Sequence, residues 1–324
     1  MQLQQILNIN IHRMKPFYKS IIALAVIILF PCSKIFAQNE QDAVMMGKRN
    51  LCISGTYAHS NWIDYWEGTF NRSNQNMGRV STRTTMLMLN YGVSDKLNLM
   101  VSLPHVATNA SAGTLHGLSG WQDLGFYAKY RPIKKFFGKQ RLSLLVVAGY
   151  TMPSNDYNID FLPMSIGMGS KVATGRIIAD YQYNGLFASV STSYQVKGNV
   201  QIDRPAYYTT QQINSNEVKM PNSGNSQLRL GYRNQLVIAE GFVDYMKTFG
   251  GFDIRRNDMP FVSNEMNSTT IGVEGKFYIK ELPELGVHTS VWHTVDGRNV
   301  GQSSGFMAGL LYTLKFSKPS TSRQ

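Results

Sequence analysis

The chain has 324 residues, of which 43% are hydrophobic, 11% aromatic and only 16% charged, with a formal net charge of +12. The apolar content excludes a disordered chain, which combines low hydrophobicity with high net charge. A mean hydropathy of −0.20 and a single long apolar run argue against a bundle of transmembrane helices, and two cysteines exclude a disulfide scaffold and a Cys-rich metal centre. A large all-β protein with 17 Tyr and 28 Gly remains.

The N-terminus has the parts of a secretory signal peptide. A basic stretch at 14–19 precedes an apolar stretch at 21–30, which is too short to cross a bilayer as a helix. Ala37 then offers a cleavage site, so we predict a signal peptide over residues 1–37, with Met14 as an alternative start. Cleavage there removes four basic residues and no acid, which lowers the net charge from +12 to +8.

From residue 48 onward, about twelve stretches of near ten residues alternate between apolar and polar side chains. A membrane-spanning strand needs about 9–11 residues, with apolar side chains facing lipid at every second position. Half-buried strands of a soluble β-sandwich show the same period, so alternation alone leaves both folds open. One such apolar stripe consists of Leu186, Ala188, Val190, Thr192 and Tyr194.

The lengths of the connections separate the two folds. Short turns are predicted at 94–96, 184–185 and 234–235, and medium ones at 132–140 and 280–285. Long polar segments alternate with them, at 60–80, 107–120, 152–170, 198–224, 250–267 and 295–304. Short turns on one side and long loops on the other are typical of an outer-membrane barrel. We therefore predict an all-β fold, a transmembrane antiparallel barrel of about twelve strands at 38–316, with a short periplasmic tail at 317–324.

Aromatic side chains gather at both ends of the predicted strands, on the apolar face. Tyr and Phe favour any strand, but amphipathic rings at strand ends mark the two interfaces of a membrane. The rings at the short-turn ends are Tyr91, Tyr130, Tyr181, Tyr183, Tyr232, Phe277 and Phe316. Those at the long-loop ends are Tyr150, Tyr194, Tyr245 and Phe306.

Two hairpin-like segments carry a family resemblance. The first joins NYGVSDKL at 90–97 to VSLP at 101–104, and the second joins GWQDL at 120–124 to AKYR at 128–131. They resemble the outer-membrane transporter-like family labelled meta-pathway of phenol degradation, which is loosely related to fatty-acid and aromatic-hydrocarbon channels. The specific part covers about residues 84–131. The resemblance implies a barrel without catalytic residues that takes up aromatic or other hydrophobic small molecules.

The polar face of the strands collects charges that would be costly against lipid, by about 2–4 kcal/mol for Arg or Lys at mid-depth. They form either a pore whose charges select the solute or a salt-bridge network that makes the barrel rigid and nearly closed. A two-residue turn at 234–235 would place Arg229 directly opposite Glu240. The lumen candidates are Asp123, Lys129, Arg131, Arg176, Asp180, Arg229, Arg233, Glu240, Asp244, Glu274 and Lys276.

Two long loops hold aromatic candidates. The loop at 60–80 could fold inward and bind an apolar or sugar ring, or form a collar at the lipopolysaccharide boundary. The loop at 198–224 is the longest and is a second candidate for a lid or plug. The aromatic residues are Trp62, Tyr65, Trp66, Phe70, Tyr207 and Tyr208.

No enzyme is predicted. A barrel phospholipase needs a Ser nucleophile within hydrogen-bond reach of a His base. His59 and Ser60 are adjacent, and adjacent strand residues point to opposite faces. His288 and His293 differ by five and also face opposite sides. The sequence shows no metal-spaced cluster and no cofactor motif, so no cofactor or metal is expected.

We therefore expect an outer-membrane channel or transporter of a Gram-negative cell for small, hydrophobic or aromatic molecules. The alternative is a closed structural or surface-interaction barrel that acts through its extracellular loops. The expected partners are outer-membrane lipid and lipopolysaccharide, an unidentified solute and the barrel-assembly machinery, with no nucleic acid. We expect a monomer.

Overall fold

The computed structural model describes residues 39–256 and 258–316. The predicted signal peptide at 1–37 and the predicted tail at 317–324 lie outside these residues. Within the described part, no helix is long and apolar enough to span a membrane.

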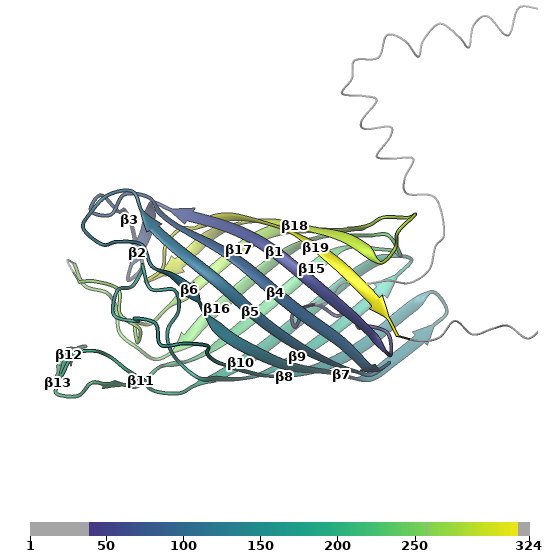
Figure 1. Cartoon of the computed structure of the whole chain (residues 1–324), viewed down its shortest axis with the longest axis horizontal. Coiled ribbons are helices and arrows are strands. Elements are labelled where there is room, and N and C mark those ends of the chain that lie inside the picture. Colours follow the sequence, from purple (N-terminus) through teal and green to yellow (C-terminus); the bar gives the residue numbers. More distant parts are fainter. Residues whose placement is uncertain (1–38, 257, 317–324) are drawn as a thin grey trace, which may run out of the picture. The chain divides into compact units, whose positions relative to one another are not determined.

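Twelve long antiparallel strands in the described residues close into a barrel (Figure 1). The sheet closes because β1 pairs with both β4 and β19, and β4 pairs with β5. This closure confirms the predicted fold class. The strands are β1 (Asn50–Trp62), β4 (Val80–Ser94), β5 (Leu97–Ala110), β7 (Asp123–Phe137), β8 (Gln140–Pro153), β9 (Val172–Tyr183), β10 (Leu186–Lys197), β15 (Asn222–Arg233), β16 (Val237–Phe249), β17 (Asn267–Tyr278), β18 (Leu285–Arg298) and β19 (Ser304–Lys315).

The connections alternate as the sequence predicted, but two turns differ. The medium connection predicted at 132–140 is wrong, because β7 continues to Phe137 across an irregularity between Tyr130 and Ile133. Only residues 138 and 139 turn the chain, with Gly138 at a φ of 60° that favours glycine. The turn predicted at 234–235 is one residue longer than expected and covers residues 234–236. Its cause is the Asn234 side-chain oxygen, which accepts hydrogen bonds from the backbone N–H groups of residues 236 and 237.

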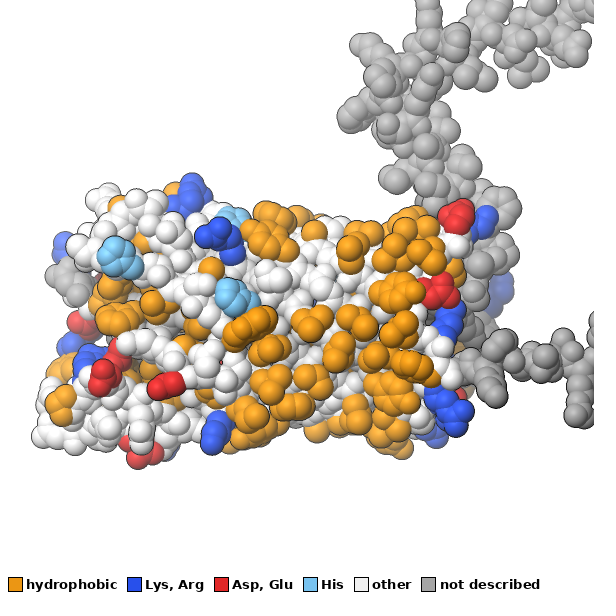
Figure 2. Space-filling model, viewed as in Figure 1, with side chains coloured by type: hydrophobic (Ala, Val, Ile, Leu, Met, Phe, Trp, Pro, Cys, Tyr) orange, Lys and Arg blue, Asp and Glu red, His pale blue; other side chains and the backbone are white. Residues whose placement is uncertain are grey.

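An apolar belt crosses the outer wall on the face of the barrel that Figure 2 shows. Side chains on the outward register are exposed along every long strand, as Leu87, Val190 and Leu310 illustrate. The eleven aromatic residues predicted for the interfaces are all exposed on this wall, which confirms their orientation. An exposed apolar belt this wide fits hydrocarbon rather than water.

Short strands lie in the loops at the long-loop end of the barrel. β2 (Asp64–Glu67) pairs with β3 (Phe70–Ser73), and β6 (Ser119–Trp121) adds to β5. Loops 154–171, 198–221 and 250–266 share an apolar cluster that includes Ile159, Val218 and Val262. The longest of these loops contains β11 (Val200–Gln201), β12 (Tyr207–Tyr208), β13 (Gln212–Ile213) and β14 (Glu217–Val218).

The belt predicts a depth-dependent cost for a charge. Val190 lies at the middle of the outward stripe of β10 and is 56% exposed, whereas Leu186 opens the same strand at the turn and is 62% exposed. We expect Val190→Arg to lower the free energy of unfolding in lipid vesicles by about 2–4 kcal/mol and Leu186→Arg by about 0–1 kcal/mol. Urea titrations of both variants measure this, and equal losses would contradict the assigned position of the belt.

Candidate functional site

The lumen is the candidate site, and it holds the predicted charges. Of the eleven lumen candidates, eight are buried and three are half-buried. The half-buried residues are Asp123, Arg131 and Asp244. The buried ones are Lys129, Arg176, Asp180, Arg229, Arg233, Glu240, Glu274 and Lys276.

A segment that the sequence analysis did not single out lies among these charges: residues 39–46, which we call the lumen plug. Asp42 Oδ1 lies 3.2 Å from Lys129 Nζ, and Asp42 Oδ2 lies 3.1 Å from Lys276 Nζ. Lys129 is on β7 and Lys276 is on β17, which are six strands apart in either direction around the barrel. One carboxylate therefore joins opposite walls of the lumen.

Lys129 holds the plug by more than its ion pair. Its ammonium group donates to the backbone carbonyls of Asp42 at 2.9 Å and Val44 at 3.2 Å, and also to that of Asn39. The side chain is 0% exposed. A buried ammonium needs such a full set of acceptors, because an unpaired charge in an apolar interior costs several kcal/mol.

The plug is folded locally around Asp42. Its carboxylate accepts the N–H of Val44 at 3.0 Å and the N–H of Asn39 at 3.1 Å, and the Asn39 side chain accepts the N–H of Asp42 at 2.8 Å. Burial alone would raise the pKa of Asp42, but Lys129, Lys276 and these N–H groups hold that pKa below its ordinary value. The carboxylate is therefore ionised at neutral pH.

The apolar side chains of the plug cover apolar parts of the lumen wall. Ala43 and Met45 pack in one cluster with Leu145, Val147 and Ile178 of β8 and β9. Val44 and Met46 face other strands, in clusters that include Phe187 and Tyr278 respectively. The plug thus covers inward-facing apolar side chains that would otherwise line an aqueous lumen.

Next to the plug, Arg229 holds two carboxylates. Glu240 and Glu274 are direct cross-strand partners on β16 and β17. Two like charges in such positions destabilise a strand pair unless a counter-ion is present. Arg229 Nη1 donates to Glu240 Oε1, and it donates to Glu274 Oε2 at 3.0 Å. Glu274 Oε1 also lies 3.2 Å from Lys276 Nζ and 3.1 Å from His288 Nε2. The group of charges is continuous with Asp42.

The expected register of Arg229 and Glu240 is wrong by two residues. Arg229 pairs with Phe242 across the strands, and Glu240 pairs with Gly231. The longer turn after Arg233 causes this shift, and a shift by two keeps both charges on the inward face. Gly231 has no side chain, so Arg229 can reach Glu240 along the diagonal.

The network continues along the lumen toward the long loops. Gln227 Oε1 accepts from Arg229 Nε at 2.6 Å, and its amide donates to Asp244 at 3.1 Å. Asp244 also accepts two bonds from the Asn225 amide at 2.8 and 2.9 Å, and Asn225 Oδ1 lies 3.3 Å from Arg176 Nη1.

A separate group of charges surrounds Asp180. Its carboxylate lies 3.0 Å from Arg141 Nη2 and 3.4 Å from Arg233 Nη1, and it also accepts from the Ser189 hydroxyl. Arg233 stacks over the Phe187 ring at 4.0 Å. The sequence analysis omitted Arg141, although it has the inward parity of Leu145 on β8. At the turn end, Arg131 donates to the Asp95 carbonyl at 2.7 Å.

At the opposite end, loop 154–171 is bound to the inner wall. The Tyr157 hydroxyl donates to Asp123 at 2.5 Å, and the Thr108 hydroxyl donates to the Met164 carbonyl at 2.6 Å. Met164 is fully buried. This loop therefore narrows the long-loop end of the lumen.

The six aromatic loop candidates do not form a single cluster. Trp66 is buried and its backbone N–H donates to the Val300 carbonyl at 2.9 Å, while the Trp62 and Tyr65 ring centroids are 6.1 Å apart. Phe70 is 70% exposed. The β2–β3 hairpin therefore packs on the β18–β19 loop. Of the second pair, Tyr207 is buried in the loop cluster, and Tyr208 is exposed beneath Arg255.

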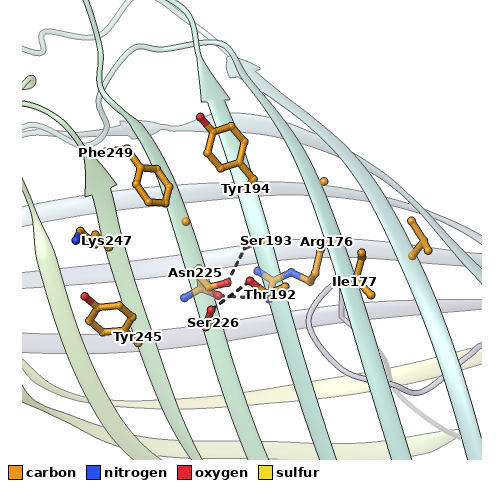
Figure 3. A pocket seen from close by; sticks show the side chains of 13 residues that line it. Arg176, Ile177, Thr192, Ser193, Tyr194, Asn225, Ser226, Tyr245, Lys247 and Phe249 are labelled. Carbon is orange, nitrogen blue, oxygen red and sulfur yellow. Dashed lines mark hydrogen bonds between the residues drawn. The ribbon is translucent and has the colours of Figure 1, made fainter.

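The outer wall also has a groove of about 460 Å³ across β9, β10, β15 and β16 (Figure 3). Exposed rings flank it, with Tyr194 stacked on Phe249 at 5.5 Å. Arg176 and Asn225 point to the lumen side of the same wall. The exposed rings place this groove on the outward face of the wall, although Arg176 and Asn225 of the lumen network also contribute to its lining.

One His–Ser contact lies outside the pairs considered in the sequence analysis. His293 Nδ1 is 2.8 Å from Ser304 Oγ on the outer wall. Among the described residues, no carboxylate or amide bonds to the other ring nitrogen, so a complete triad is not assembled there. Within the same part of the chain, no group of three His, Cys, Asp or Glu could hold a metal ion.

Comparison with solved structures identifies the type of barrel. The chain is similar to an outer membrane channel from Pseudomonas putida F1, with a TM-score of 0.65 and 13% identity over 86% of this chain and 100% of that one. The fold is that of an outer-membrane β-barrel. The NanC porin also aligns, with a TM-score of 0.47 and 9% identity over 82% of this chain and 100% of that one.

The CymD monoaromatic hydrocarbon channel aligns with a TM-score of 0.37 and 11% identity, over 84% of this chain and 90% of that one. No protein-family model matches the sequence, and no curated protein matches it.

The charge network predicts an order of stabilities. Glu274 contacts three basic groups and Glu240 contacts one, whereas Glu217 lies exposed in a loop beside Asn199. Removing a buried partner leaves an unpaired charge and can cost about 3–5 kcal/mol, while an exposed pair contributes about 0–1 kcal/mol. We expect the melting temperature in detergent to fall most for Glu274→Gln and least for Glu217→Gln. The fall for Glu240→Gln should be intermediate, because Arg229 still forms its ion pair with Glu274. Equal melting temperatures would mean that the lumen charges are solvated.

Proposed function

We propose that this chain is a gated channel of a Gram-negative outer membrane, closed by the lumen plug in the conformation described here. In this proposal the mature chain lacks its signal peptide, is inserted by the barrel-assembly machinery and acts as a monomer. The bridge from Asp42 to Lys129 and Lys276 is the observation that carries the proposal. Residues 39–46 are not part of any strand of the sheet, so their departure would leave the strand ladders intact.

The contacts of the plug suggest the class of solute. Its departure would uncover the apolar patch around Leu145, Val147 and Ile178, together with the ammonium groups of Lys129 and Lys276. A small hydrophobic or aromatic molecule can replace the apolar contacts, and a carboxylate or phenolate on it can replace Asp42. The proposed solutes are therefore small apolar or aromatic molecules, with a preference for those that carry one negative group.

A closed barrel that acts through its surface loops is the second candidate. The apolar cluster shared by loops 154–171, 198–221 and 250–266 favours it, because an ordered loop layer can present a fixed surface. Salt bridges throughout the lumen are compatible with both candidates. The two differ in whether the plug can move.

Single-channel recording distinguishes them. Asp42→Asn removes the charge that joins the two lysines, and we expect it to raise the open probability in planar bilayers at least tenfold. The matched control is Asp203→Asn, which removes an exposed loop carboxylate and should leave the open probability unchanged.

A tether provides the complementary measurement. With Cys52→Ser in the background, a disulfide between Ala43→Cys and Val147→Cys, which are members of one packed cluster, should abolish conductance until a reductant is added. Solute uptake into liposomes should follow the same pattern. Silent records from Asp42→Asn would contradict the gated channel and favour the closed barrel. Conductance that the tether does not change would show that the plug is not the gate, and would also contradict the proposal.

A further inference from the structure

A basic patch lies on the outer wall at the long-loop edge of the apolar belt. Arg83 on β4 is exposed, and its outward register is that of Leu87 and Leu89. His59 on β1 is the direct cross-strand partner of Arg83. Arg79 donates to the side chain of Asn61, the next outward residue of β1. Two guanidinium groups and one imidazole therefore share this small area.

A groove in the wall lies next to this patch, on the membrane side. It is an open hollow of about 440 Å³ lined by residues that include Gly55, Tyr57, Thr85, Val287, Ala308 and Leu310. The hollow exists because the outward positions of β1 and β19 carry a glycine and an alanine there. Apart from Gly55 and its two chain neighbours, no heavy atom of the described residues lies within 4 Å of the position that a Cβ at Gly55 would take.

The groove and the basic patch are continuous. His59 is the next outward residue after Tyr57 on β1, and Arg83 is the next outward residue after Thr85 on β4. Two residues of a strand span about 7 Å. An apolar chain in the groove would thus bring a head group attached to it to the basic side chains.

The basic side chains of the patch are not neutralised by the described part of the chain. Among residues 39–256 and 258–316, no carboxylate forms an ion pair with Arg83 or Arg79. Figure 2 shows basic and histidine side chains at the loop-side edge of the apolar belt on this face of the barrel. An exposed cationic group at a membrane interface attracts anionic lipid, and guanidinium binds phosphate with bidentate geometry.

We propose that this groove and patch bind the lipid A part of lipopolysaccharide, with an acyl chain in the groove and phosphate groups on Arg83 and Arg79. The site is at the long-loop end, which faces the outer leaflet in a barrel of this type. Two guanidinium groups on one side of the groove suit a bisphosphorylated head group. The proposal is independent of the plug and of any transport through the lumen.

The test is lipid binding to the purified, folded full-length barrel in detergent. Bisphosphorylated lipid A should raise the melting temperature of the wild type and remain bound in native mass spectrometry. We expect the affinity to fall about fivefold for Arg83→Gln and at least twentyfold for the Arg79→Gln/Arg83→Gln double variant. Gly55→Leu should also weaken binding, because its Cβ has open space and the rest of the side chain would occupy the groove.

Matched controls separate this site from general attraction to anionic lipid. Lys139→Gln removes an exposed charge at the turn end, and Gly175→Leu fills the groove of Figure 3, where Gly175 also has open space. Both should bind lipid A as the wild type does. Monophosphorylated lipid A and phosphatidylglycerol should bind at least tenfold more weakly. Equal binding of phosphatidylglycerol, or unchanged affinity in Gly55→Leu and the double Arg variant, would overturn the proposal.

Discussion

The carboxylate of Asp42 connects two lysines on opposite walls of the barrel, and the interior is organised around this connection. A lysine that faces the lumen of a narrow barrel must remain hydrated or find an acid, because a buried unpaired charge costs several kcal/mol. Lys129 and Lys276 are both buried and both contact Asp42, while Lys276 also contacts Glu274. The plug is thus a counter-ion as well as an obstruction.

The plug also covers apolar side chains that face into the lumen. Charges alone could be satisfied by water, but Leu145 and Ile178 also face inward and are fully buried beneath Ala43 and Met45. The plug therefore combines one ionic bridge with four apolar side chains in eight residues. In the proposed channel, a solute with an apolar body and an anionic group would compete with both kinds of contact.

The barrel itself could be predicted because its rules are periodic and local. Outward residues such as Val190 and inward ones such as Glu240 follow from parity, and alternating connection lengths separate a barrel from a sandwich. The register at 234–237 could not be predicted from length, because the Asn234 side chain bonds two N–H groups and lengthens the turn. The number of polar residues between two strands does not reveal such a side-chain bond.

The plug was missed because its partners are remote. Asp42 meets Lys129 across 87 residues and Lys276 across 234 residues of sequence. Two signals could have found it. The predicted lumen charges contain one more base than acids, which implies an acid from elsewhere, and residues 144–147 of β8 are apolar on both faces, which implies a cover inside the barrel.

Thiol accessibility of the plug tests the central claim most directly. In a Cys52→Ser background, Met45→Cys places one thiol among the buried contacts of the plug. A membrane-impermeant thiol reagent should label this cysteine slowly when Asp42 is present and at least tenfold faster in the Asp42→Asn variant. Equal and rapid labelling of both would show that the ionic bridge does not hold the segment in the lumen, and would contradict the account.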